Sequence, residues 1–176
     1  STHFRFFFTD VAELDITNKE AVDAYLKEHS IAYIINCAAY TAVDKAEDDV
    51  ALCYKINRDA IANLALAAAN SGAKIIHIST DYVFDGTANA PYTEDVETNP
   101  QSVYGKSKRE GEIELLKACP ESIVIRTAWL YSIYGNNFVK TMIKYGRERD
   151  ELNVVADQTG TPTNAADLAK AILHIL

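Results

Sequence analysis

The sequence contains little cysteine and no long hydrophobic run, and both shortages exclude classes of protein. Its 176 residues include three cysteines, Cys37, Cys53 and Cys119, which lie far apart and form no CxxC pair. This spacing argues against a disulfide framework, a redox motif or a metal site, and it predicts reduced core residues of a cytoplasmic protein. No apolar segment approaches the roughly 20 residues that a membrane-spanning helix requires, and no signal peptide is recognised.

Positive charge is scarce as well. The chain has 17 lysines and arginines against 25 aspartates and glutamates, a formal net charge of -8 at pH 7. Because nucleic acids and anionic membranes bind basic surfaces, neither is expected as a partner. The four histidines show no metal-ligand spacing, and His77, inside a hydrophobic segment, is interpreted as a hydrogen-bonded core residue.

What the sequence does have is a regular alternation of strand and helix patterns. With 48% hydrophobic and 24% charged residues, it fits one globular domain with a substantial core. Strands are predicted at 4–8, 31–36, 74–80, 122–128 and 152–156, and helices at 17–29, 44–70, 102–118, 136–148 and 164–176. A capping box, Thr17-x-x-Glu20, opens the first helix, and Ser71-Gly72 ends the second helical stretch. Strands that are apolar throughout indicate a parallel sheet covered on both faces, so the predicted class is a doubly wound α/β fold.

Two predicted strands end in unusual segments, and ligands of such sheets bind at the carboxyl ends of the strands. NCAAYTAVDKAE (36–47) offers small residues against which a cofactor could lie, although tight packing of a helix on the sheet explains them equally well. STDYVFDG (79–86) begins with Ser79, Thr80 and Asp81, which either serve a site or cap backbone groups at the strand end.

A third segment, Tyr104-Gly-Lys-Ser-Lys108, places a phenol and an ammonium group four residues apart. On the predicted helix the two side chains share one face. The spacing alone is weak, because surface pairs of this kind arise by chance. Its position after a small-residue strand end and a Ser-Thr strand end favours a catalytic set.

Together these segments resemble the extended short-chain dehydrogenase/reductase family and, within it, the dTDP-4-dehydrorhamnose reductases. The similar segments are STDYVFDG, PYTEDVETNPQSVYGKSKREGE (91–112), RTAWLY (126–131), GNNFVKTM (135–142), DQTGTPT (157–163) and AAYTAVDKAE (38–47). The resemblance implies a Rossmann-like fold and reduction of the C4 ketone of dTDP-4-dehydro-L-rhamnose (dTDP-4-dehydro-6-deoxy-L-mannose) to dTDP-L-rhamnose. It implies a dTDP-sugar substrate and NADPH or NADH as cofactor, and it leaves the choice between the two cofactors, and a homodimer, open.

The resemblance also implies roles for the catalytic set. Tyr104 would be the general acid that protonates the C4 oxygen while hydride arrives from the nicotinamide. Lys108 would stabilise the phenolate, because a free phenol has a pKa near 10, and would hold the nicotinamide ribose. Thr80 would hydrogen-bond the substrate carbonyl, with Ser79 as the adjacent candidate.

Further residues are assigned to the two ligands by the same resemblance. Besides Tyr104 and Lys108, the cofactor would be lined by Asp15, Ile16, Ala38, Ala39 and Tyr40. The sugar would be bordered by Asp81, Tyr82, Trp129 and Asn137. Three of these have an open alternative, namely a turn residue for Asp15, a core residue for Trp129 and a helix cap for Asn137. Asn57 and Arg126 are interpreted as structural, and no residue is assigned to a metal.

One hallmark of the family is missing. Residues 1–35 contain no G-x-x-G-x-x-G turn, which in the family brings backbone N–H groups and a helix N-terminus to the cofactor pyrophosphate. The strand before that turn is missing too, and the C-terminal substrate-binding part is incomplete. We therefore expect residues 1–176 to be a partial NAD(P)-binding domain from the interior of a longer enzyme, nearly inactive by itself.

Two other functions stay open. A nucleotide-sugar epimerase or dehydratase would share Tyr104 and Lys108, but dehydratases carry an acidic pair after the threonine, where this chain has Asp81-Tyr82. A regulatory subunit similar to the β subunit of methionine adenosyltransferase would keep the same residues as a binding module without turnover.

Overall fold

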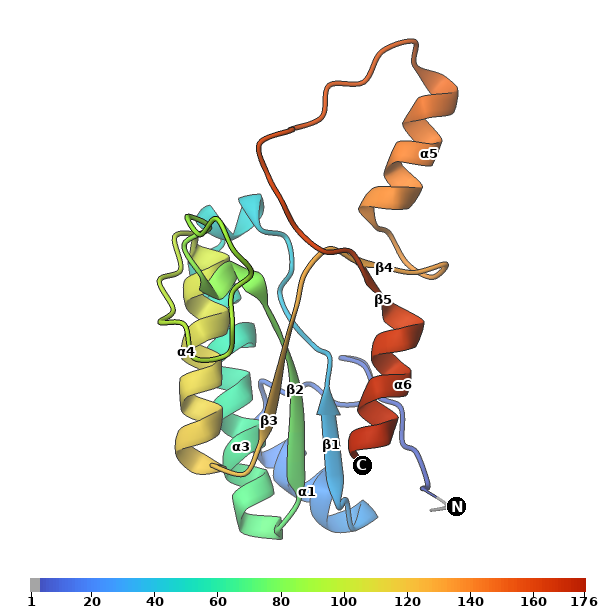
Figure 1. The fold of residues 1–176 in the computed structure, drawn as a ribbon. Coiled ribbons are helices and arrows are strands. Elements are labelled where there is room, and N and C mark those ends of the chain that lie inside the picture. Colours follow the sequence, from blue (N-terminus) through green and yellow to red (C-terminus); the bar gives the residue numbers. More distant parts are fainter. Residues whose placement is uncertain (1–3) are drawn as a thin grey trace. The chain divides into compact units, whose positions relative to one another are not determined.

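The computed structural model describes residues 4–176, which form two compact units. The first unit runs through Ile125, and the second begins at Arg126. Figure 1 shows the helices and strands of both units.

The first unit follows the predicted alternation of strands and helices. Its helices are α1 (Lys19–His29), α2 (Val50–Tyr54), α3 (Ala60–Ser71) and α4 (Val103–Ala118), with the short helical turns η1 (Asp44–Glu47), η2 (Lys55–Asp59) and η3 (Asp81–Val83). Its strands are β1 (Tyr33–Asn36), β2 (Lys74–Thr80) and β3 (Ile123–Thr127), the last of which ends in the second unit.

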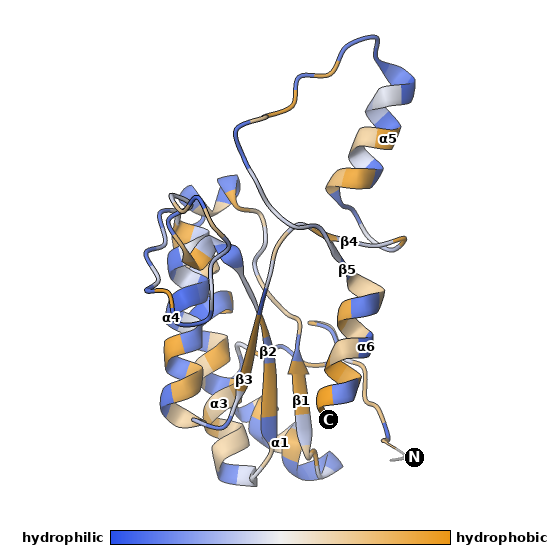
Figure 2. Ribbon diagram, in the orientation of Figure 1, coloured by the Kyte–Doolittle hydropathy of each residue, from blue (hydrophilic) through white to orange (hydrophobic). Residues whose placement is uncertain are grey.

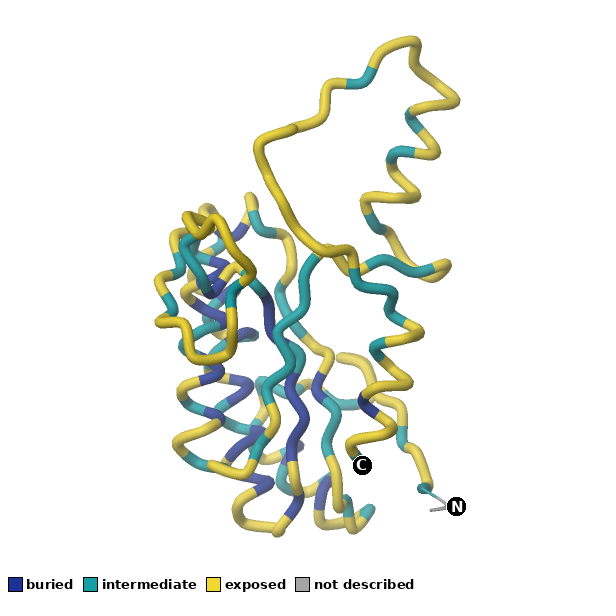
Figure 3. The backbone as a smooth tube through the Cα atoms, in the orientation of Figure 1, coloured by how far each residue is buried: buried dark blue, intermediate teal, exposed yellow. Residues whose placement is uncertain are grey.

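The three strands form one sheet in the order β1-β2-β3, with β2 in the centre. β1 and β2 run parallel, with Tyr33 opposite Lys74 and Asn36 opposite His77. Isoleucines lie side by side within both strands (Figure 2), and β2 is the most deeply buried of the three (Figure 3). A parallel pair whose strands are connected through helices agrees with the predicted α/β class.

Helix α3 packs against α1 on one side and α4 on the other, and α3 and α4 also contact β2. Their apolar faces form the main core with that strand, and its fully buried members include Val22, Leu26, Ile61, Leu64, Ile75 and Leu115. Burial of each of these large side chains contributes about 1.5–3 kcal/mol to folding. The core fixes α4 against the sheet, and α4 carries the predicted Tyr104 and Lys108.

The ends of two helices test the predicted signals. Helix α1 is capped by Asn18, whose Oδ1 accepts the N–H of Ala21 at 3.0 Å, so the predicted cap at Thr17 is wrong by one residue. Asparagine ranks slightly above threonine as an N-cap, and the two stand side by side in the sequence. Gly72 ends α3 in the left-handed conformation, with φ +76°, as predicted.

Two predicted strands do not form. Residues 4–8 and 152–156 are irregular, and neither segment pairs with a strand of the sheets formed by residues 4–176. Aromatic and β-branched residues favour extended backbone, but a strand also needs a neighbour for its N–H and C=O groups. The predicted stretch 44–70 is helical, as expected, although it is divided among η1, α2, η2 and α3.

The second unit contains β4 (Leu130–Tyr131), α5 (Phe138–Glu148), β5 (Thr163–Asn164) and α6 (Ala165–Ile175). β4 and β5 pair in parallel. The two helices agree with the predictions at 136–148 and 164–176, and each begins just after an asparagine cap, Asn137 or Asn164.

The close packing of α4 gives a first testable prediction. A Cβ at Gly111 would overlap the carbonyl oxygen of Asn57, so Gly111→Ala must push two backbones apart. We expect it to lower the free energy of unfolding by about 1–3 kcal/mol, measured by urea denaturation with far-ultraviolet circular dichroism. Gly146→Ala on α5 is the matched control, because nothing lies within 4 Å of a Cβ there. Its stability should be equal to or slightly above that of the parent. Unchanged stability of Gly111→Ala would contradict the close approach.

Candidate active site

The segments that follow β1 and β2 leave the same edge of the sheet, because the strands are parallel and in register. β2 ends at Thr80 and continues directly into η3, on which the beginning of α4 packs. Gly105 permits this approach, since a Cβ there would overlap the carbonyl oxygen of Tyr82. The edge therefore gathers a strand end, a short helical turn and the first residues of a long helix.

Helix α4 presents a buried polar face. Tyr104, Lys108 and Glu112 follow one another at four-residue spacing and are 9%, 2% and 1% exposed. Charged side chains are almost never buried this deeply unless they have partners. The predicted shared face of Tyr104 and Lys108 is thus present, and their burial rules out the alternative of a surface pair.

The phenol of Tyr104 lies beside the end of β2 and η3. Its ring meets Tyr82 edge to face, with the ring centroids 5.6 Å apart. Burial raises the pKa of Tyr104, a hydrogen bond with the Thr80 side chain opposes that effect, and the charge of Asp81 adds to it. The phenol is therefore protonated at neutral pH, the state in which it can donate a proton.

Thr80 has the capping role that the sequence left open, and it also lies beside the phenol of Tyr104. Its hydroxyl accepts the N–H of Tyr82 and donates to Oδ1 of Asp81, both at 3.2 Å, so it caps η3. The same side chain interacts with Tyr104. Burial raises the pKa of the Asp81 carboxyl, and the hydrogen bond from Thr80 opposes that rise. Backbone capping and proximity to the phenol are thus compatible in one residue.

Ser79 faces a different partner. Its hydroxyl donates to Oε1 of the buried Glu112 at 2.5 Å. Arg109 pairs with the other carboxylate oxygen of Glu112 at 3.1 Å and donates its Nε–H to Thr98 at 2.8 Å. These contacts favour a structural role for Ser79, fastening β2 to α4, and leave Thr80 as the hydroxyl beside the phenol.

Lys108 is held by the backbone of β2. Its Nζ donates to the carbonyl oxygen of Ile78 at 2.7 Å and lies 3.3 Å from Nε2 of His77. Burial lowers the pKa of Lys108 to about 8, against the opposing charge of Glu112. The charge of Asp81 raises the pKa of Tyr104. Stabilisation of the phenolate by Lys108, which the family resemblance implies, stays a prediction.

The small-residue segment after β1 is tied to α4 through Asn57. The Asn57 side chain accepts the N–H of Tyr40 at 2.8 Å and donates to the carbonyl oxygen of Tyr40 at 3.1 Å. It also donates to the hydroxyl of Ser107 at 3.0 Å, and Ser107 donates to the carbonyl oxygen of Tyr104 at 2.8 Å. Asn57 is structural, as predicted, and its particular task is to join the predicted cofactor-lining segment to α4.

The sequence analysis did not assign a role to three residues that help to position α4, namely Gly105, Gly111 and Ser107. The signal for the two glycines is their position, because glycine inside a helix costs about 1 kcal/mol relative to alanine and needs a reason. In both cases the reason is a backbone carbonyl of another segment. Ser107 gave no signal, because Asn57, the partner that links it to the other segment, is distant in the sequence.

The other predicted cofactor residues lie in two places. Asp15 accepts the N–H of Thr17 at 2.9 Å, which is the turn role left open for it, and Ile16 packs against the main core. Ala38 is exposed and Ala39 partly buried at the carboxyl end of β1. Their contact with a cofactor stays a prediction.

Two predicted sugar-site residues belong to the second unit. Trp129 is 47% exposed, so the core alternative is wrong, and it has a left-handed backbone with φ +48°. A non-glycine residue there is strained, a feature that clusters at functional sites. Asn137 caps α5 by accepting the N–H of Lys140 at 3.1 Å and donates to the carbonyl oxygen of Ser132 at 2.7 Å. Its capping alternative is thus present, and sugar contact stays a prediction for both.

Metal and membrane signals are absent from the part of the chain that the structure describes. No three histidine, cysteine, aspartate or glutamate side chains in residues 4–176 come together in a way that could hold a metal ion. No helix in the same range combines the length and the apolar composition needed to cross a bilayer.

Known proteins are similar to this chain in sequence and in fold. The curated dTDP-4-dehydrorhamnose reductase of Aggregatibacter actinomycetemcomitans is 48% identical over 166 residues, which are 94% of this chain and 56% of that protein. The crystal structure of a dTDP-4-dehydrorhamnose reductase from Clostridium acetobutylicum superimposes with a TM-score of 0.92 at 55% identity, over 95% of this chain and 59% of that one. The enzyme of the same name from Bacillus anthracis, solved in complex with NADP, gives the same TM-score and coverage at 46% identity.

These similarities cover most of this chain but only part of each relative, and the chain spans about half the length of the curated relatives it matches. The family described as RmlD substrate binding domain matches residues 1–176. Since that match extends over the whole sequence, this chain belongs to the RmlD substrate-binding domain family.

Proposed function

We propose that this chain supplies the catalytic residues of an NAD(P)H-dependent reductase that converts dTDP-4-dehydro-L-rhamnose to dTDP-L-rhamnose. The observation that carries the proposal is the convergence of Thr80 with Tyr104 and Lys108 at the carboxyl edge of β2. The reductase names of relatives at 48% and 55% identity support the choice of substrate.

The reaction adds a hydride to C4 and a proton to the C4 oxygen, which turns the ketone into an alcohol. The reduced nicotinamide would supply the hydride when bound. Tyr104 would supply the proton, for which its raised pKa keeps it ready at neutral pH. Thr80, beside the phenol, would donate a hydrogen bond to the same oxygen and so orient the ketone. This requires the hydroxyl to leave Asp81, its partner in the structure.

The residues at the strand ends fit the nicotinamide half of a cofactor. The exposed Ala38 leaves the carboxyl end of β1 free of a bulky side chain, and the ammonium of Lys108 carries N–H groups beyond the one that Ile78 accepts. Lys108 would therefore hold the ribose hydroxyls. The NADP bound to the Bacillus anthracis relative makes NADPH the first cofactor to test.

The pyrophosphate half lacks its expected cradle, because residues 4–35 offer no glycine-rich turn. We therefore propose that the chain by itself turns over slowly. A chimera in which the chain replaces the matching 59% of the Clostridium acetobutylicum reductase separates this deficit from the competence of the catalytic residues.

The chimera gives the central prediction. With NADPH and dTDP-4-dehydro-6-deoxy-L-mannose it should oxidise NADPH, whereas its Tyr104→Phe variant should lose about 100- to 10,000-fold in kcat and still bind NADPH. Absorbance of NADPH measures turnover, and the unaltered Clostridium acetobutylicum enzyme is the positive control. A folded chimera that binds NADPH but reduces no sugar would contradict the proposal and favour the regulatory-subunit alternative.

A second prediction isolates the role of Lys108 from the chemistry. Lys108→Met should weaken NADPH binding by the chimera about 10- to 100-fold, because a charged donor is lost. Its thermal stability should change little, because losing the hydrogen bond to Ile78 offsets the removal of a buried charge. Lys106→Met, on the exposed side of the same helix, is the matched control and should bind normally. Isothermal titration calorimetry measures the binding, and equal affinities of the two variants would refute the ribose role.

A further inference from the structure

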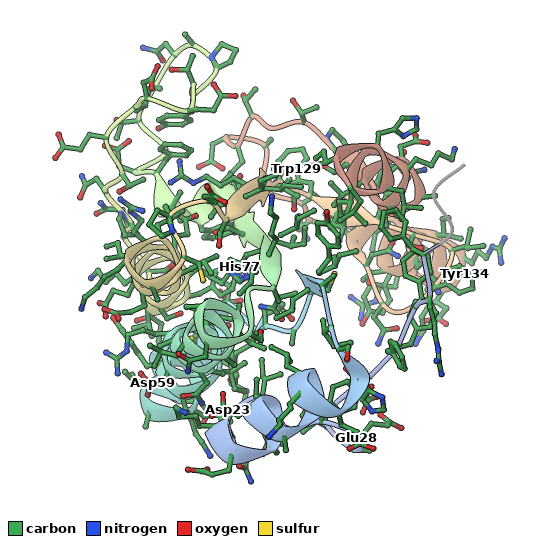
Figure 4. The ribbon with its side chains drawn as sticks, turned by 90° about the horizontal axis from the view of Figure 1, so that it is seen from below. Asp23, Glu28, Asp59, His77, Trp129 and Tyr134 are labelled. Carbon is green, nitrogen blue, oxygen red and sulfur yellow. The ribbon has the colours of Figure 1, made fainter. Side chains whose placement is uncertain are left out.

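His77 is a buried histidine that the proposed mechanism does not use. It lies on β2 with no exposed surface, between Asn36 at the end of β1 and Lys108 on α4. Figure 4 shows it in the interior of the first unit, beside β2. Its Nδ1 lies 2.9 Å from the side-chain nitrogen of Asn36, and its Nε2 lies 3.3 Å from Nζ of Lys108.

The orientation of Asn36 decides which ring nitrogen of His77 carries the hydrogen. The backbone N–H of Ala38 donates to Oδ1 of Asn36 at 3.2 Å, so the amide nitrogen is the atom that faces His77. An amide nitrogen can only donate, so Nδ1 of His77 must be the accepting, unprotonated nitrogen. In a neutral imidazole the hydrogen then sits on Nε2, facing Lys108.

A donor at Nε2 interacts differently with the two forms of Lys108. The ammonium form has no lone pair, so its N–H groups and the imidazole N–H oppose each other. The neutral amine has a lone pair that accepts the imidazole N–H, while its own N–H still donates to the carbonyl oxygen of Ile78. The arrangement of Asn36 and His77 thus stabilises the neutral amine relative to the ammonium.

We infer that His77 is a positioning residue that Asn36 fixes as a hydrogen-bond donor toward Lys108, and that this contact eases the release of a proton by Lys108. The inference rests on the proposed function for its purpose. Each turnover leaves Tyr104 as a phenolate, which a proton released by Lys108 would return to the phenol. The resulting amine would then regain a proton from water.

The surroundings of both groups agree with this assignment. Burial lowers the pKa of His77 to about 3, and the charge of Lys108 lowers it as well, so the ring is neutral at neutral pH. Lys108 is faced by Glu112 on its own helix, by Cys37 after β1, by Cys53 on α2 and by His77 on β2. The first three favour the ammonium form, and burial favours the amine.

The first experiment reads the tautomer directly and needs no turnover. In nitrogen-15 spectra of the chain, the two ring nitrogens of a neutral histidine differ strongly in shift according to which one is protonated. We expect His77 to show a protonated Nε2 and an unprotonated Nδ1 throughout the neutral range. A protonated Nδ1 would overturn the inference, even if no variant of His77 folds.

The second experiment titrates Lys108 in chain labelled with isotopic lysine, and the signal is identified by its loss in Lys108→Met. His77→Phe should raise the pKa of Lys108 by about one unit, because the opposing donor is removed. Asn36→Leu should also raise the pKa of Lys108. Without the donor from Asn36, the imidazole can carry its hydrogen on Nδ1 and accept an N–H of the ammonium at Nε2. His174→Phe, the same change at an exposed histidine of α6, is the control and should leave it unchanged.

An unchanged or lower pKa of Lys108 in folded His77→Phe would refute the inference. Neither measurement uses substrate or cofactor, so failure of the proposed reductase activity would leave both results interpretable. In an active chimera, His77→Phe should also move the pH profile of kcat to higher pH, by about the shift in pKa measured for Lys108. A purely structural role would lower kcat without moving its profile.

Discussion

The arrangement of the site depends on how closely helix α4 approaches its neighbours. At Gly105 and Gly111 a backbone carbonyl of another segment occupies the space that any side chain would fill. The contact at Gly105 places Tyr104 beside η3, and the contact at Gly111 holds the middle of the helix against the π-type turn that contains Asn57. Because both contacts involve backbone, neither can be relieved by a side-chain rotation, so the buried polar face of α4 has one position.

The position of α4 buries several polar side chains, which is unfavourable in free energy unless they are hydrogen-bonded. Lys108, Glu112 and His77 are nearly inaccessible to solvent, yet each has a hydrogen-bond partner. These partners are the Ile78 carbonyl for Lys108, the Ser79 hydroxyl for Glu112 and the Asn36 amide for His77. A core selected for stability alone would place apolar side chains there, because buried charges rarely stabilise a fold. Local departures from packing rules of this kind are expected at functional sites, where specificity of position matters more than free energy.

Sequence reasoning was accurate where the signal is local. Residues 103–118 form a helix and bury Tyr104 and Lys108 on one face, because helical spacing alone determines which side chains share a face. It failed where partners are distant, as for the strand predicted at 4–8, which depends on a neighbouring strand. Likewise, nothing in the residues around Ser79 indicates that its hydroxyl binds a carboxylate far along the chain. Local sequence patterns predict helices, strands and the side chains that share a helix face, whereas contacts between distant elements require the three-dimensional structure.

The half-exposed indole of Trp129 has a consequence for spectroscopy. It is the one tryptophan of the sequence and lies in the second unit, packed against Gly160. Its fluorescence therefore monitors the second unit, whereas far-ultraviolet ellipticity is dominated by the longer helices of the first. Two denaturation curves recorded by these signals would coincide for a chain that unfolds as one cooperative body and separate for one whose units melt independently.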